Sequence, residues 1–128
     1  TGKISKVKEI RKSCPKSFII LSGDDSLNYR TLKEGGNGYI SVTSNIAPKE
    51  CSEMFNAFVK KNYKEAKRID TKLKKLNNLL FVDTNPIAIK YALSEAGFCK
   101  NTLRLPLTKL KLKDSSLIKK ELKQLKLI

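Results

Sequence analysis

The sequence predicts an α/β fold with parallel strands covered by helices. Two apolar runs, 18–21 and 39–42, have the length and composition of buried strands. A helix-length segment that ends at Gly35-Gly36 lies between them, and it is long enough for a parallel crossover. Because two parallel strands form neither a covered sheet nor a barrel alone, we expect the remaining strands of the fold to lie elsewhere.

Helices are predicted on both sides of the first strand. Apolar residues recur at helical spacing over 3–13, and this pattern stops before Pro15. The helix between the strands begins at a capping side chain supplied by Asp24, Asp25 or Ser26. Glycine then ends that helix, because glycine accepts a positive φ.

From Pro48 onward the pattern is helical only, which gives the element order α, βα, βα and then three helices. One helix begins at Pro48 and ends near Asn62, and the next has a regular apolar stripe from Ala66 to Leu80. A third helix has Asn85 as its cap and Pro86 in its first position, and a fourth is capped by Asp114 or Ser115 after an extended connection.

The composition excludes several kinds of catalytic and metal site. The chain has no histidine, so Ser-His and Cys-His dyads and His-based metal sites are excluded within it. Its three cysteines, Cys14, Cys51 and Cys99, are far apart in the sequence and form no Cys-x-x-Cys pair. We therefore predict reduced, structural cysteines, no metal and no cofactor.

The net charge of +15 is carried by lysine, with 23 lysines against 4 arginines spread over every predicted helix. Base readout favours arginine and stacking needs exposed aromatic side chains, so the pattern predicts a solvated surface rather than a nucleic-acid site. No apolar run reaches the length of a membrane span and no signal-peptide pattern is present. We expect a cytoplasmic protein and no membrane partner.

Candidate chemistry lies after the two predicted strands, where parallel folds collect their functional residues. Gly23 permits a close backbone approach to a ligand, and Asp24 and Asp25 offer carboxylates, although capping of the following helix explains both aspartates equally. Lys90 has no acid or base partner nearby in the sequence. It is therefore predicted to be a surface lysine rather than a Schiff-base amine.

Four segments, 21–25, 35–45, 81–87 and 103–108, together resemble the dihydrodipicolinate synthase family. The resemblance implies the C-terminal part of a (β/α)8 TIM barrel, in which the two strands are the seventh and eighth. Residues 1–60 would then form the sixth to eighth helices with these strands, and 61–128 the C-terminal three-helix extension. The chain departs from the family at Asp83-Thr84, where Glu-Pro is usual.

The resemblance also implies a reaction, the condensation of pyruvate with aspartate semialdehyde through a lysine Schiff base in lysine biosynthesis. Thr1 is not an initiator Met, and the Schiff-base lysine is expected just upstream of it, so no catalytic residue lies in this chain. By resemblance, Gly23 and Ile40 line the pyruvate pocket. Asp24 with Asp25 contacts or organises the second substrate, and Asn85 lies near the pocket mouth.

The partners implied are the two substrates, the missing N-terminal part of the barrel, and further copies in a homotetramer. Alone, the chain is expected to be inactive. Two alternatives stay open: another pyruvate-dependent aldolase or lyase, such as an N-acetylneuraminate lyase, and an inactive basic remnant that binds polyanions.

Overall fold

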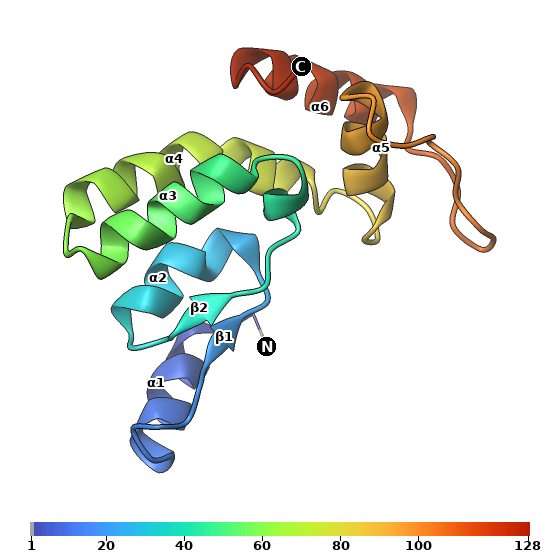
Figure 1. Ribbon diagram of the computed structural model, residues 1–128. Helices are drawn as coiled ribbons and strands as arrows, with labels where there is room; N and C mark the ends of the chain where they lie inside the picture. Colours follow the sequence, from blue (N-terminus) through green and yellow to red (C-terminus); the bar gives the residue numbers. More distant parts are fainter. Residues whose placement is uncertain (1) are drawn as a thin grey trace.

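The computed structural model describes residues 2–128 and contains a small parallel sheet with helices packed around it (Figure 1). Strand β1 (Leu21–Ser22) pairs with β2 (Gly38–Tyr39), with Leu21 opposite Gly38. The parallel βαβ unit predicted from the sequence is confirmed. Thr1, next to which the Schiff-base lysine is expected, lies outside the described residues.

The element order is as predicted: α, βα, βα and then three helices. Two short 3-10 helices, η1 and η2, follow the two strands directly. In chain order the helices are α1 (Ile4–Ser13), η1 (Asp25–Leu27), α2 (Asn28–Lys33), η2 (Thr43–Asn45), α3 (Pro48–Val59), α4 (Tyr63–Leu79), α5 (Ile87–Glu95) and α6 (Leu112–Gln124).

The strands are shorter and less covered than the apolar runs predict. Each has two residues, because beyond them the backbones are joined only by single bonds such as Ile40 N–H to the Ser22 carbonyl, 2.8 Å. The expectation of strands buried on both faces is wrong for these residues: Ile19 is 65% exposed and Ile40 is 73% exposed. No other part of residues 2–128 packs over these side chains.

Two helix starts differ from the predictions. Pro86 is the N-cap of α5 rather than its first residue, so Asn85 lies one position outside the helix. The last helix begins at Leu112 with Lys111 as its N-cap, and Asp114 lies in its first turn. An acidic side chain there still interacts favourably with the helix dipole, which explains why the pattern alone pointed to a cap.

The core is built on the apolar stripe of α4, which is confirmed. Leu76 and Leu80 are fully buried, as are Ile118 and Leu122 on α6. Helices α3 and α4 run side by side in opposite directions and make the most extensive contact of any two elements (Figure 1). The connection between α5 and α6 extends away from this body, and Leu105 within it is 88% exposed.

Candidate functional site at the carboxyl ends of the strands

Three of the residues predicted to form the site line one pocket. Gly23 follows β1, Ile40 follows β2 and Asn85 precedes α5, and together they border a cavity of about 370–620 Å³ class size, measured at 620 Å³. The sequence separates these residues by up to 62 positions. The parallel strands and the start of α5 bring them to one side of the fold, as expected for residues beyond the carboxyl ends of parallel strands.

The wall of this pocket at Gly23 is open. A Cβ atom built on Gly23 would meet nothing within 4 Å, and the side chain of Ile40 on the neighbouring strand is largely exposed. A small ligand can therefore approach the backbone directly after β1 without a side chain in the way. The exposed Asn85 side chain lies at the far border of the pocket.

Asp24 and Asp25 are adjacent in sequence but have different environments. The partly exposed Asp24 caps η1, and its Oδ1 accepts from the backbone N–H and hydroxyl of Ser26 at 2.9 and 2.6 Å. Asp24 lines a second pocket, between β1 and α1, and not the one that contains Ile40 and Asn85. The prediction that Asp24, Asp25 or Ser26 caps this helix is confirmed for Asp24.

Asp25 is 2% exposed and lines neither of these pockets. Its Oδ2 accepts from the backbone N–H groups of Val42 and Thr43, at 2.8 and 3.1 Å, and its Oδ1 accepts from Asn28 Nδ2 at 2.9 Å. This carboxylate joins the loop after β1 to the loop after β2. Of the two roles that resemblance implies for it, contacting or organising, the geometry favours organising.

A buried side chain of α4 completes this connection. Asn77 Nδ2 donates to the backbone carbonyl of Asp25 at 3.2 Å, and Asn77 Oδ1 accepts from the Thr43 hydroxyl at 2.7 Å. Sequence reasoning missed Asn77. The available signal was its position in the apolar stripe, four residues after Leu73 and three before Leu80, where a polar side chain is buried and needs partners.

Lys90 is another residue whose position differs from its prediction. Every other lysine of residues 2–128 is exposed, which confirms the solvated lysine surface, but Lys90 is only partly exposed and lines the pocket. Its ammonium group donates to the backbone carbonyl of Thr102. The connection between α5 and α6 thus holds the amine at the pocket border.

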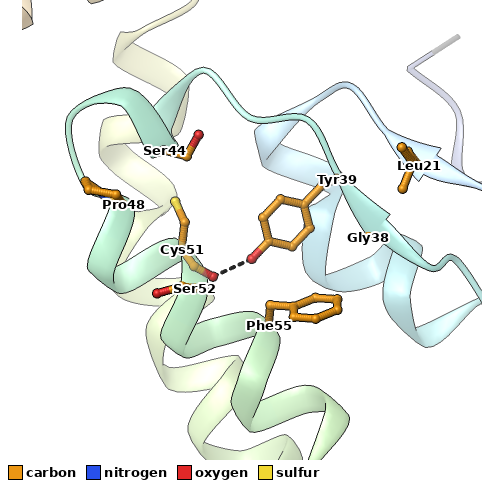
Figure 2. Close-up of a pocket in the computed structure, with 8 residues that line it drawn as sticks. All are labelled: Leu21, Gly38, Tyr39, Ser44, Pro48, Cys51, Ser52 and Phe55. Atoms are coloured by element: carbon orange, nitrogen blue, oxygen red, sulfur yellow. Dashed lines mark hydrogen bonds between the residues drawn. The ribbon is translucent and has the colours of Figure 1, made fainter.

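A separate, apolar pocket of about 370 Å³ opens beside the free edge of β2 (Figure 2). Leu21, Tyr39 and Phe55 supply its apolar wall, and the Tyr39 hydroxyl donates to the carbonyl of Cys51 on α3. Burial raises the pKa of the Tyr39 phenol, and raises the pKa of the Cys51 thiol to about 11. Both groups are therefore neutral at pH 7, as an apolar wall requires.

The cysteines are free, as predicted, but their burial varies: Cys51 is buried, Cys14 is partly exposed and Cys99 is exposed. The expectation of a structural role is therefore not met by the burial of Cys99. Within residues 2–128, no three His, Cys, Asp or Glu side chains are grouped so that they could hold a metal ion. In the same part of the chain, no helix has the length and apolar character needed to cross a membrane.

These features together define a class of protein. Parallel βα units with a pocket beyond the strand ends, apolar strand faces left uncovered and helices appended after the last unit form part of a (β/α)8 barrel with a helical extension. A model of the dihydrodipicolinate synthetase family matches residues 1–125. The chain belongs to this family.

Individual relatives agree with this family. The 4-hydroxy-tetrahydrodipicolinate synthase of Bartonella bacilliformis is 44% identical over 111 residues, which are 87% of this chain and 38% of the relative. A dihydrodipicolinate synthase structure from Aquifex aeolicus superposes with a TM-score of 0.95 at 35% identity, and the match covers 99% of this chain and 43% of that one.

A third relative is the chloride-inhibited dihydrodipicolinate synthase of Acinetobacter baumannii, solved in complex with pyruvate. It is 35% identical with a TM-score of 0.94, and the match covers all of this chain and 44% of that one. The chain thus spans about two fifths of the length of the relatives it matches. The family's enzymes are lyases of the aldolase type.

Proposed function

We propose that this chain is the C-terminal part of a 4-hydroxy-tetrahydrodipicolinate synthase. The complete enzyme would condense pyruvate with aspartate semialdehyde, and a lysine outside this chain would form the Schiff base with pyruvate. The observation that carries the proposal is the match along the whole chain to structures of this enzyme, including one that binds pyruvate. The reaction needs an amine as nucleophile and a pocket for two carboxylated substrates.

In this proposal the chain supplies two walls of the pocket. Gly23 and Ile40 would line the pyruvate side, and Asn85 would lie at the mouth. Their shared border on one cavity supports this arrangement. Asp24, partly exposed, is the carboxylate that remains available for the second substrate, whereas Asp25 would organise the two loops because all its acceptor positions toward them are occupied.

Two open margins of the sheet support an N-terminal part that completes the barrel. Beside β2, the apolar pocket in Figure 2 lies where another strand would pair with the free edge. Beside β1, the exposed side chains of Phe18 and Ile19 would be covered by the preceding unit. We propose residues 1–60 as the barrel part of this chain and 61–128 as its extension.

The chain alone would be inactive, which a trapping experiment tests. Borohydride reduction with pyruvate should leave the mass of the isolated chain unchanged. In the complete enzyme the same treatment should add a pyruvyl group to a lysine outside residues 2–128. A pyruvyl adduct on a lysine of this chain, for example on the partly buried Lys90, would contradict the proposal.

The Gly23→Ala variant of the complete enzyme tests the pocket. The added methyl group meets nothing within 4 Å in this chain, so the stability should not change, but it would occupy space that pyruvate needs. Pyruvate affinity should fall by about tenfold or more, since a methyl in a tight site is worth about 1–3 kcal/mol. Asn78→Ala, exposed on α4, is the control. Equal affinities for both variants would remove Gly23 from the site.

We also propose a homotetramer for the complete enzyme and a cytoplasmic location. The free state of all three cysteines supports a reducing compartment. Light scattering of the complete enzyme tests the tetramer, and fractionation of cells tests the location.

A further inference from the structure

We infer that Asn77 is a positioning residue, through which the helical extension holds the two pocket loops at a fixed separation. Its two side-chain atoms each bond to a different loop. Nδ2 donates to the Asp25 carbonyl in the loop after β1, and Oδ1 accepts from the Thr43 hydroxyl in the loop after β2. All three residues are buried, at 6%, 2% and 0% exposure respectively.

The bridge is closed by a second connection between the same loops. The Asp25 carboxylate accepts from the Val42 and Thr43 backbone N–H groups, so Asp25, Thr43 and Asn77 form a ring of contacts. In such a ring each partner fixes the others, and the position of one loop cannot change without breaking a bond to the other. Asn77 is the only member of the ring that comes from the extension.

The neighbours of Asn77 on α4 show that packing alone does not explain this residue. Leu73, Leu76 and Leu80 surround it on the same helix face and are nearly or fully buried. A polar amide on such a face is unfavourable unless both its donor and its acceptor are paired. An apolar side chain would bury as well there, but it would not define where the two loops lie.

The consequence for the site depends on the proposed function. Gly23 and Asp24 precede Asp25 directly, and Ile40 to Val42 precede Thr43. The groups that Asn77 holds are therefore one to three residues from the pocket walls, and binding geometry tolerates only small displacements. The extension would thus set the width of the pyruvate pocket without touching a substrate.

The test compares Asn77→Ala with Asn78→Ala, the exposed asparagine next to it. Amide hydrogen exchange measured in the complete enzyme should be at least about fivefold faster at Val42 and Thr43 in Asn77→Ala, with the other strand and core amides unchanged. Unchanged protection of these two amides, or a uniform loss of protection over the whole chain, would overturn the inference. This readout does not depend on the enzyme's reaction.

Thr43 allows a second test that preserves shape. Thr43→Val removes the hydroxyl and should reproduce the local loss of protection, whereas Thr43→Ser keeps the hydroxyl and should restore it. In the complete enzyme the KM for pyruvate should rise several-fold in Asn77→Ala and Thr43→Val, and return toward the original value in Thr43→Ser. Equal values for valine and serine would overturn the positioning role. If no variant nor the original enzyme uses pyruvate, the proposed function fails while the exchange result still decides on Asn77.

Discussion

The substitution Asp25→Ala provides the sharpest test of how the two strand-end loops are held together. The carboxylate accepts three hydrogen bonds, from Asn28 Nδ2 at 2.9 Å and from the backbone N–H groups of Val42 and Thr43 at 2.8 and 3.1 Å. Alanine removes all three acceptors from a site that is 2% exposed. Water does not easily replace them, because the side chain lies beneath both loops.

The expected cost follows from the two backbone donors. A buried donor left without a partner costs about 1–3 kcal/mol, so Asp25→Ala should lower the free energy of unfolding by about 3–5 kcal/mol. Asp25→Asn keeps one oxygen for Val42 and Thr43 and presents an amide to Asn28. Because Asn28 Oδ1 is buried without a partner, rotation of its amide pairs the two side chains. We expect about 1–2 kcal/mol for this variant, from the lost charge.

Urea unfolding followed by circular dichroism measures both values, with Asp24→Ala as the matched control. Asp24 only caps a short 3-10 helix at the surface, so its removal should cost about 1 kcal/mol. Equal costs for Asp24→Ala and Asp25→Ala would refute the reasoning. So would an Asp25→Asn variant as unstable as Asp25→Ala.

Three further predictions concern packing and titration. Leu76→Ala, at a fully buried position of α4, should lower the free energy of unfolding by about 2–5 kcal/mol in the same urea experiment, and a cost below 1 kcal/mol would contradict the assigned core. Gly36→Ala should cost about 1–3 kcal/mol, because a Cβ there lies 2.8 Å from the Thr31 carbonyl oxygen; a variant with an unchanged unfolding midpoint would contradict this contact. Iodoacetamide should label Cys99 in the folded chain and Cys51 only after unfolding, as peptide mass spectrometry can check. Because the pKa of Cys51 is about 11 in the folded chain, above its usual value, the unfolded thiol ionises first, so stability should fall as pH rises from about 9 to 11 and should gain nothing from this group below pH 8; a flat profile that Cys51→Ala leaves unchanged would contradict it.

The helical part of the fold could be predicted from the sequence because its signals are local. The stripe from Ala66 to Leu80 and the turn at Asn62 each depend on residues within one or two helical turns, and both agree with the structure. The strands could not be bounded in this way. Their ends depend on which backbone groups find a partner on another strand, and in residues 2–128 only two residues of each run do.

The candidate site was predicted only in part for the same reason. The motifs pointed to Gly23, Ile40 and Asn85, and their common pocket agrees with that grouping. The motifs did not distinguish Asp24 from Asp25. Which of two neighbouring carboxylates turns inward depends on donors 17 and 18 residues away, at Val42 and Thr43.

By itself, the sequence determined the order of the elements, the lysine-rich surface and the family, since periodicity, composition and motif spacing are properties of the chain. The tertiary structure decided which polar side chains are buried and what they hold together. Asn77 shows the difference: on the sequence it is one polar residue in an apolar stripe, and in the fold it bonds to two loops that are 52 and 34 residues away. Those partners are close only because the α4 face packs against the ends of both strands.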